Sequence, residues 1–416
     1  MSLAPAWLIP ADLSGGNEAR LLRGGDALFP RMLAAVDAAR REVWVATYIF
    51  HHDETGLRLC ARLVAAARRG VKVCVVVDGF GSKDSLGALQ REFAGSGVAF
   101  AVFRPLDRWW RWLQPGQLRR LHQKLCVVDG EVGFVGGINL IDDRIDLHHG
   151  ASEQPRLDFA VELRGPVVQA VGQAARAVWT RAWLGRDVGE ELLALARGPA
   201  RLVRAASLWR RVHMPRGRGR LSHPLPPVRA AFVLRDNLRQ RRTIERAYVD
   251  AISRAETAVD LVCPYFYPGQ RIRRALRQAA QRGVRVRLLL QGKVDYRLAA
   301  LAAQALYAEL LAHGVEIYEY LPAFLHAKVA VVDDQWATVG SSNIDPLSLL
   351  LNLEANVVLL DGRFAEQLRA EIETAQAASR QVTSPPHTGW RALLGRAWVA
   401  WIAHVYLRVA GAAGRY

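Results

Sequence analysis

Two stretches of the sequence place a histidine, a lysine and an aspartate at the same spacing. Their residues are His122, Lys124 and Asp129 in "LHQKLCVVDG", and His326, Lys328 and Asp333 in "LHAKVAVVDD". Because residues two apart in a strand point to the same face, each histidine and its lysine aim at one spot. An imidazole can attack phosphorus or move a proton, and an ammonium group can stabilise charge on phosphate oxygens. The pattern therefore indicates phosphodiester chemistry.

Each stretch also predicts a hairpin that returns an asparagine to the histidine. Asn139 follows His122 by 17 residues, and the midpoint of that interval falls at an Asp-Gly pair that is typical of tight turns. Asn343 follows His326 by the same interval. We therefore expect each asparagine to lie opposite the histidine of its own stretch, beside the small residues "GG" (136–137) or "GSS" (340–342).

The strands and helices expected around these stretches occur twice. Residues 42–50 predict a buried strand, which is followed by a helix and a second strand, "VKVCVVVDG". Residues 258–266, the helical "RIRRALRQAAQ" and the strand "RGVRVRLLLQG" repeat that order. Such units favour parallel pairing with right-handed crossovers. The predicted fold class is α/β: two fused repeats with mixed, mostly parallel sheets, helices on the faces and an active site between the halves.

The duplication divides the chain into predicted segments. They are an N-terminal segment at 1–24, repeats at 25–185 and 230–378, a basic linker rich in Pro, Gly and Arg at 186–229, and a C-terminal segment at 379–416.

The first half is longer than the second just before its histidine. The interval between matching residues falls from 217, for Gly97 and Gly314, to 204, for the two histidines, which leaves 13 additional residues in the first half. This insert contains Trp109, Trp110 and Trp112. The indole rings suit stacking on nucleobases, an acyl pocket, a membrane surface or simple core packing.

Composition limits the class of protein. A chain of 416 residues with 51% hydrophobic residues exceeds one ordinary core, so two domains or two fused halves are expected. The net charge of +17 attracts polyanions such as nucleic acid or anionic lipid, although an Arg-rich chain can also be basic for purely compositional reasons. The N-terminus has neither a basic region nor a sustained apolar run, so no secretory signal is expected.

Other residues with metal-binding chemistry have simpler interpretations. His51, His52 and Asp53 are adjacent, but Asp53 suits the N-cap of the following helix better than a metal site. The cysteines lie in apolar stretches without CxxC spacing, which favours reduced core residues of a cytosolic protein. They are Cys60, Cys74, Cys126 and Cys263.

The paired motifs resemble the phospholipase D superfamily. HxKxxxxD occurs twice, followed by "GGIN" and "GSSNID", and the resemblance spans both halves. "GSSNIDPLSLLLNLEANV" and "RDNLRQRRTIERAYVDAI" more narrowly resemble bacterial cardiolipin synthases, particularly forms that lack N-terminal transmembrane helices. The resemblance implies a phosphatidyl-histidine intermediate, with the second histidine acting as acid and then as base. It implies no metal and no cofactor.

The resemblance also implies roles for single residues. We expect His122 to be the nucleophile and His326 the acid, with environments that separate their pKa values. By resemblance, Asp158 orients His122 and Glu354 orients His326. Asp129 and Asp333, beside the turns, are expected to brace the hairpins and their lysines.

The C-terminal sequence favours a lipid surface over DNA. Between Leu394 and Val409, apolar residues fall on one helical face and basic residues on the other. The uncharged run at 397–407 has 11 residues, and a bilayer requires about 20. This segment therefore suits a helix in the headgroup plane, with docking on the protein's own core as the alternative.

The sequence thus predicts a peripheral phosphatidyltransferase on the cytoplasmic face of the bacterial cell membrane. Its partner would be anionic phospholipid, and two phosphatidylglycerol molecules would give cardiolipin and glycerol. The alternatives are a hydrolase or transphosphatidylase with another donor or acceptor, and a nuclease of the same superfamily, with nucleic acid the less favoured partner. The oligomeric state is left open.

Overall fold

The structure of the protein is a computed structural model. It describes residues 13–105, 119–146, 150–197, 228–236, 240–293 and 303–384. The tryptophan-containing insert, most of the predicted linker and the amphipathic segment after residue 384 lie outside the described residues.

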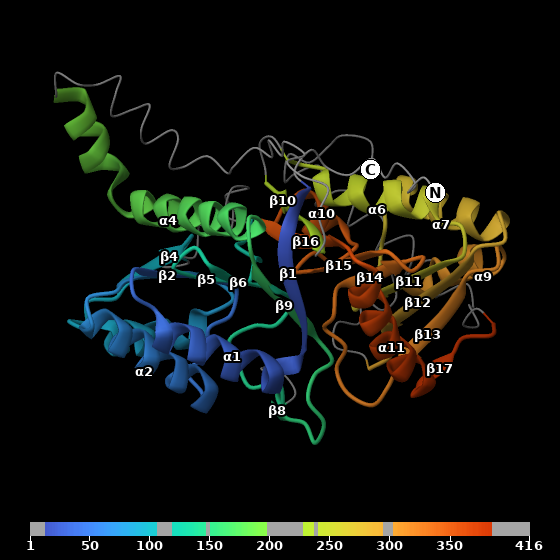
Figure 1. Ribbon diagram of the computed structural model, residues 1–416, viewed down its shortest axis with the longest axis horizontal. Helices are drawn as coiled ribbons and strands as arrows, with labels where there is room; N and C mark the ends of the chain where they lie inside the picture. Colours follow the sequence, from blue (N-terminus) through green and yellow to red (C-terminus); the bar gives the residue numbers. More distant parts are fainter. Residues whose placement is uncertain are drawn as a thin grey trace, which may run out of the picture.

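One sheet of 15 strands runs through both halves of the molecule (Figure 1). The first half supplies β1 (Ser14–Arg23), β2 (Glu42–Thr47), β3 (Lys72–Asp78), β4 (Ala99–Phe103), β5 (Leu125–Val128), β6 (Val132–Gly136) and β9 (Phe159–Arg164). The second half supplies β10 (Val228–Arg235), β11 (Ala258–Cys263), β12 (Arg285–Gln291), β13 (Glu316–Tyr320), β14 (Val329–Val332), β15 (Trp336–Gly340), β16 (Glu354–Leu360) and β17 (Ser379–Gln381). A separate two-stranded antiparallel sheet consists of β7 (Ile145–Asp146) and β8 (Gly150–Ala151).

The strand order confirms the predicted duplication. From its outer edge inward, the first half reads β4-β3-β2-β5-β6-β9-β1, and the second half repeats this as β13-β12-β11-β14-β15-β16-β10. β1 and β10 pair antiparallel at the centre and join the halves. The N-terminal segment predicted at 1–24 therefore contains a central strand, and β17, from the predicted C-terminal segment, pairs at the edge with β13.

The expectation that parallel pairs predominate was wrong. Parallel pairing is confined to β2-β3-β4 and β11-β12-β13, and the other pairs of the sheet are antiparallel. Hydrophobic periodicity identified the strand–helix–strand units of each half. It did not reveal β9 and β16, which return beside the hairpins and carry antiparallel pairing to the centre.

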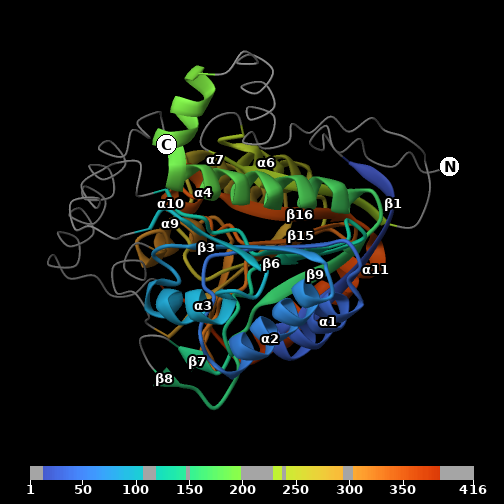
Figure 2. The same ribbon diagram turned by 90° about the vertical axis from the view of Figure 1, so that its left-hand side faces the viewer.

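Helices cover both faces of the sheet (Figures 1 and 2). In the first half, α1 (Gly24–Ala38), α2 (Glu54–Arg68) and α3 (Leu86–Phe93) lie on one side, and α4 (Val167–Arg197) lies on the other. In the second half, α6 (Thr243–Arg254), α7 (Gln270–Gln281) and α9 (Tyr307–Leu311) lie opposite α11 (Gly362–Ala377). The short α10 (Pro346–Leu350) precedes β16, and a 3-10 turn (Lys83–Ser85) precedes α3.

The halves share one hydrophobic core. Buried residues of α4 and α11, including Val171 and Leu368, belong to the same buried cluster, which also contains strand residues of both halves. Leu121 and Leu325, which precede the two motif histidines, lie within it. The core therefore holds the motifs of the two halves against each other.

Local sequence signals agree with this arrangement. Asp53 caps α2, since its side chain accepts a hydrogen bond of 2.8 Å from Gly56 N, as predicted. The four cysteines are buried and unpaired, as expected of core residues. Helix α4 continues to Arg197, so the regular structure of the first repeat extends beyond the predicted boundary at residue 185. Within the described ranges, no helix combines the length and the apolar character needed to span a bilayer.

Candidate active site

The two motif stretches meet where the halves join. Leu121 pairs with Leu353, and Leu157 pairs with Leu325, each as a single parallel bridge. His122 N donates to Leu353 O at 3.0 Å, and His326 N donates to Leu157 O at 2.9 Å. Each motif is therefore fixed to the backbone of the opposite half, next to the start of β9 or β16.

Each histidine binds a carboxylate of the opposite half. His122 Nδ1 lies 3.0 Å from Glu354 Oε2, and His326 Nδ1 lies 2.6 Å from Asp158 Oδ2. The predicted partners were therefore exchanged: Glu354, not Asp158, orients His122. The reason is the pair of bridges, which carry each motif across the joint to a carboxylate that is distant in sequence.

The motif lysines lie beneath the histidines. Lys124 Nζ donates to His122 O at 2.8 Å, and Lys328 Nζ donates to His326 O. Burial, together with repulsion from Lys328, lowers the pKa of Lys124 to about 7, and burial lowers the pKa of Lys328 to about 8. Because Lys328 repels the charge of Lys124, an anion bound beside them would favour the charged form of both lysines.

The two histidine–carboxylate pairs differ in protonation. Burial raises the pKa of Asp158 to about 7, and burial and the nearby Lys328 hold the pKa of His326 well below its usual value. Burial also lowers the pKa of His122. The pKa of Glu354 is lowered, because attraction to His122 and hydrogen bonds outweigh its burial. Glu354 is therefore a stable anion, whereas Asp158 exchanges a proton near neutral pH and is protonated below it.

The hairpins form, but their register differs by one residue from the prediction. Val128 pairs with Val132, and Val329 with Val339. Continued to the histidines, this register sets His122 against residue 138 and His326 against residue 342, one residue short of the asparagines. Asn139 and Asn343 are nevertheless 3% and 7% exposed, and in the described part of the chain the Oδ1 atom of each has no hydrogen-bond partner.

Asp129 and Asp333 brace the hairpins at the opposite end from the lysines. Asp129 accepts hydrogen bonds from the backbone N–H groups of residues 40–42 at 2.8 to 2.9 Å. Asp333 accepts from those of residues 256–258 and from the Thr257 hydroxyl. The expected bracing of the hairpins is present, but these aspartates lie beyond β5 and β14, so the expected support of the lysines was wrong.

Sequence reasoning missed a pair of residues that position the motifs. Asp78, at the end of β3, accepts a hydrogen bond of 2.8 Å from the backbone N–H of Leu121. Gln291, at the end of β12, accepts one of 2.8 Å from the backbone N–H of Leu325. Asp78 and Gln291 are 213 residues apart, which is also the interval between the matched turns at Gly70 and Gly283. The repeat alignment was the signal that could have found them.

The space around each carboxylate also escaped prediction. Gly137 packs against Asp158, where a Cβ atom would lie 2.2 Å from Oδ1. At the matching position, Ser341 Oγ donates to Glu354 Oε2 at 2.5 Å. Tyr48 packs edge-on against His122 with ring centroids 4.9 Å apart.

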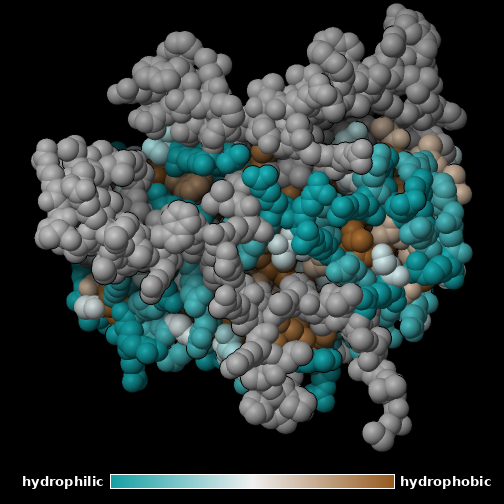
Figure 3. All heavy atoms as spheres, turned by 90° about the horizontal axis from the view of Figure 1, so that it is seen from above, coloured by the Kyte–Doolittle hydropathy of each residue, from teal (hydrophilic) through white to brown (hydrophobic). Residues whose placement is uncertain are grey.

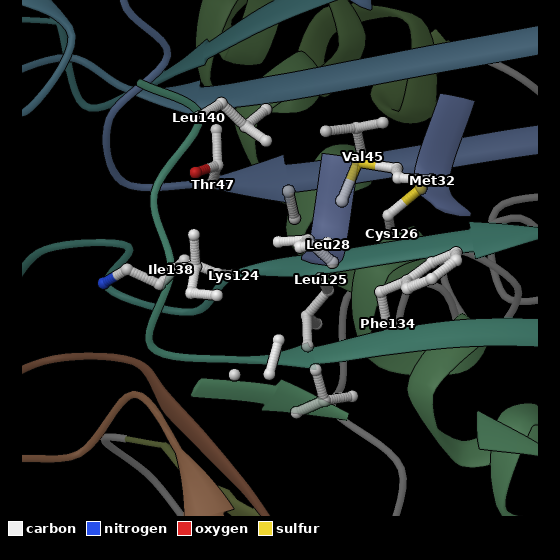
Figure 4. A pocket seen from close by; sticks show the side chains of 14 residues that line it. Leu28, Met32, Val45, Thr47, Lys124, Leu125, Cys126, Phe134, Ile138 and Leu140 are labelled. Carbon is white, nitrogen blue, oxygen red and sulfur yellow. The ribbon is translucent and has the colours of Figure 1, made fainter. Parts of the chain in front are cut away.

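A small cavity lies behind Lys124 (Figure 4). Its volume is about 20 Å³, and its lining is apolar apart from Lys124 and Thr47. The Lys124 nitrogen points away from the apolar lining, toward the strand ends. The cavity has room for one water molecule at most, so it is a packing gap and not a lipid-binding channel.

A duplicated α/β sheet that joins two histidine–carboxylate pairs over two lysines defines a protein of the phospholipase D class. A family model described as "Cardiolipin synthase, PLD-like domain" matches the chain twice, at residues 32–151 and 248–375. The chain belongs to this family.

Relatives agree with that membership. Cardiolipin synthase B of Shigella flexneri is 35% identical over 388 residues, which cover 90% of this chain and 85% of the relative. Cardiolipin synthase A of Pseudomonas entomophila is 31% identical over 380 residues, with 88% and 70% covered. The crystal structure of phosphatidylserine synthase from Haemophilus influenzae shares the fold, with a TM-score of 0.62, 12% identity and 93% of both chains covered.

Proposed function

We propose that the protein is a cardiolipin synthase that transfers the phosphatidyl group of one phosphatidylglycerol to a hydroxyl group of another. The products are cardiolipin and glycerol. The enzymatic class, phosphatidyl transfer of the phospholipase D type, follows from family membership. The observation that supports the mechanism is the exchange of carboxylates between halves, which gives one histidine an anionic partner and the other a partner that titrates near neutral pH.

In the first step, His122 Nε2 attacks phosphorus. The lowered pKa of His122 keeps its imidazole neutral. Glu354 accepts a hydrogen bond from Nδ1–H, so the proton of the ring stays on Nδ1 and the Nε2 lone pair is free to react. The phosphatidyl-histidine that forms is cationic. Ionised Glu354 stabilises that charge, and Ser341 holds the carboxylate in place.

His326 protonates the departing glycerol oxygen as the P–O bond breaks. The proton belongs to His326 and Asp158 as a coupled pair, because the carboxyl group of Asp158 has a pKa of about 7. When His326 gives up its proton to the glycerol oxygen, Asp158 can replace it. His326 then removes a proton from the acceptor hydroxyl, the new O–P bond forms and the P–N bond breaks. If water is the acceptor, the product is phosphatidic acid.

The remaining site residues act on the phosphate oxygens. Lys124 and Lys328 offer positive charge from the floor of the site. The amides of Asn139 and Asn343 are buried beside the motifs and can donate to the non-bridging oxygens.

The protein works at a membrane surface in this proposal, on the cytoplasmic face. The net charge of +17 favours an anionic leaflet. Figure 3 views the molecule from the side of α4 and α6, where hydrophilic atoms cover much of the described surface and hydrophobic atoms appear in separate small patches. The amphipathic segment that the sequence assigns to lipid contact lies outside the described residues.

The test is to incubate the purified protein with phosphatidylglycerol vesicles and to identify the products by mass spectrometry. Cardiolipin and glycerol are expected, and His122→Ala should form neither. His52→Ala is the matched control, because the His52 ring lies at the surface, 3.3 Å from Glu92, and the hydrogen bond to Ser85 Oγ comes from the His52 backbone N–H, which the substitution keeps. Phosphatidic acid without cardiolipin would mean a hydrolase. Turnover of DNA but of no lipid would overturn the proposal.

A further inference from the structure

Four arginines gather beside the first motif, apart from the histidine pairs. They are Arg104, which follows β4, Arg119 and Arg120, which precede His122, and Arg235, which ends β10. Arg104 Nη1 donates to Arg119 O at 2.9 Å, and Arg120 Nη1 donates to Arg104 O at 3.1 Å. We refer to these four residues as the arginine cluster.

Asn352 connects Arg235 with the rest of the cluster. Arg120 N donates to Asn352 Oδ1 at 3.3 Å, and Arg235 Nη1 donates to Asn352 O. Arg235 also lies opposite Glu354 in the pairing of β10 with β16. Because Glu354 holds His122, the cluster borders the His122 side of the candidate site.

The carboxylates near the cluster are already engaged. Asp78 Oδ1 lies 3.7 Å from Arg120 Nη1, but its oxygens also accept three backbone N–H groups, those of residues 80, 81 and 121. Glu354 accepts from His122 and Ser341.

Two buried guanidinium donors have no acceptor. Across the described ranges, neither Arg119 Nε nor Arg235 Nη2 has a hydrogen-bond partner. Arg235 is 1% exposed, and a buried N–H group without an acceptor is costly, so both donors favour the binding of a group that accepts hydrogen bonds.

The charge of the cluster is only partly offset. Burial lowers the pKa of Arg104 to about 10, and Arg119 and Arg120 add to this by repulsion. Burial lowers the pKa of Arg235 to about 10 as well, against the attraction of Glu354 and Asp236. The region therefore favours an additional anion.

The second half has no such group before its histidine. At the 204-residue interval of the motifs, Ala323 stands where Arg119 stands and Phe324 where Arg120 stands. The repeat fold itself does not require these arginines, so they serve something that only one side of the site must bind.

We propose that the arginine cluster binds a second phosphate diester beside the one that is cleaved. This inference rests on the proposed function, in which the second phosphate is that of the acceptor phosphatidylglycerol. A three-carbon glycerol bridge joins that phosphate to the attacking hydroxyl, which lets it lie beside the reacting phosphate without standing on the line of attack. Guanidinium groups match phosphate oxygens in charge and geometry. Water and free glycerol carry no phosphate, so the cluster favours transfer to lipid.

The test lets two acceptors compete for the same intermediate. Phosphatidylglycerol vesicles are supplied with isotopically labelled glycerol, so that transfer to lipid gives cardiolipin and transfer to glycerol gives labelled phosphatidylglycerol. Arg119→Gln should lower the ratio of cardiolipin to labelled phosphatidylglycerol about tenfold, the usual effect of one charge-assisted hydrogen bond. Arg104→Gln should lower the same ratio, with glycerol exchange retained in both variants.

Lys293→Gln is the matched control, because Lys293 follows β12 at the other side of the joint and donates to Pro322 O at 3.0 Å. Its ratio should stay that of the unchanged protein. An equal fall in both products, an unchanged ratio in both arginine variants, or the same fall in Lys293→Gln would overturn the inference.

Two further arms separate the sources of failure. Dihexanoyl phosphatidylglycerol, dissolved as monomers, removes the bilayer, and the ratio should still fall in Arg119→Gln. If the fall occurs only on vesicles, the cluster binds a neighbouring lipid and the acceptor assignment is wrong. If the unchanged protein forms no cardiolipin, the proposed function itself fails, whereas normal cardiolipin synthesis by Arg119→Gln refutes only the inference.

Discussion

The two halves of the molecule share one strand order but hold the opposite histidine in different ways. The first half presents Asp158 against Gly137, a shorter carboxylate in a tightly packed place. The second presents Glu354, a longer carboxylate that Ser341 hydrogen-bonds. In the same scaffold, burial raises the pKa of Asp158 to about 7, whereas His122 and the hydrogen bonds to Glu354 lower the pKa of Glu354. In the proposed mechanism, this difference gives a duplicated fold an acid and a nucleophile without altering its topology.

Removing each histidine and changing the leaving group tests which histidine is the nucleophile and which is the acid. His326→Ala should slow glycerol release about 1,000-fold, because general acid catalysis is lost. A p-nitrophenyl leaving group needs no acid, so this variant should cleave phosphatidyl-p-nitrophenol within about tenfold of the unchanged protein. His122→Ala should cleave neither donor. The measurement is the p-nitrophenol burst together with the mass of the covalent adduct.

The opposite result for the two histidine variants would exchange the proposed roles of His122 and His326. If His122→Ala forms an adduct with the activated donor and His326→Ala does not, then His326 is the nucleophile. His52→Ala should behave as the unchanged protein with both donors.

The packing around Asp158 gives the next largest effect. Gly137→Ala would place a Cβ atom 2.2 Å from Asp158 Oδ1, which displaces the carboxylate from His326. We expect about a 100-fold loss of glycerol release, the usual cost of misplacing a catalytic group by about 1 Å. Ser341→Ala, at the matching position, removes one hydrogen bond from Glu354 and should cost only about tenfold. Equal losses, measured by single-turnover release, would mean that the two carboxylates are held equivalently.

Much of this arrangement could be predicted from short-range patterns. The hairpins, the Asp-Gly turn and the Asp53 cap depend on a few neighbouring residues, and the duplication follows from repeated periodicity. The carboxylate partners could not be predicted in this way, because the bridge between Leu121 and Leu353 joins segments 232 residues apart. Motif spacing also does not resolve a one-residue register, which the turn geometry determines. The arginine cluster was missed because Arg104, the pair at 119–120 and Arg235 are far apart in sequence, and Arg235 joins the others only through Asn352.

The pH dependence tests the same difference at smaller scale. Asp158, with a pKa of about 7, holds the proton that His326 passes to the glycerol oxygen at pH values below 7 and loses it at higher pH. Lys124, also with a pKa of about 7, loses its charge in the same window. Glycerol release should therefore fall as pH rises through about 7, by about tenfold or more per pH unit well above it. The measurement is single-turnover release at pH values on both sides of 7.

Asp158→Asn separates the two ionisations. This variant should be slower at all pH values and should retain only the decline that the two lysines cause, with pKa values of about 7 for Lys124 and about 8 for Lys328. Glu354→Gln should lower the rate but keep the steep decline, because Glu354 stays ionised throughout this range. If the steep decline persists in Asp158→Asn, the proton that is transferred to glycerol is not held by His326 and Asp158.

The smallest effect concerns the aspartates at the hairpin turns, which differ between the halves in the number of hydrogen bonds they accept. Asp129 and Asp333 both have positive φ, 54° and 50°, which asparagine tolerates, so Asn is the least disruptive replacement. Asp333→Asn should lower the free energy of unfolding by about 2 kcal/mol and Asp129→Asn by about 1 kcal/mol, because Asp333 also accepts from the Thr257 hydroxyl. Denaturant unfolding measures both losses. Turnover per folded molecule should stay within about twofold, since each carboxylate lies at the opposite end of its strand from the motif lysine. A large loss of turnover with unchanged stability would return these aspartates to the chemistry and remove the distinction between hairpin braces and reacting groups.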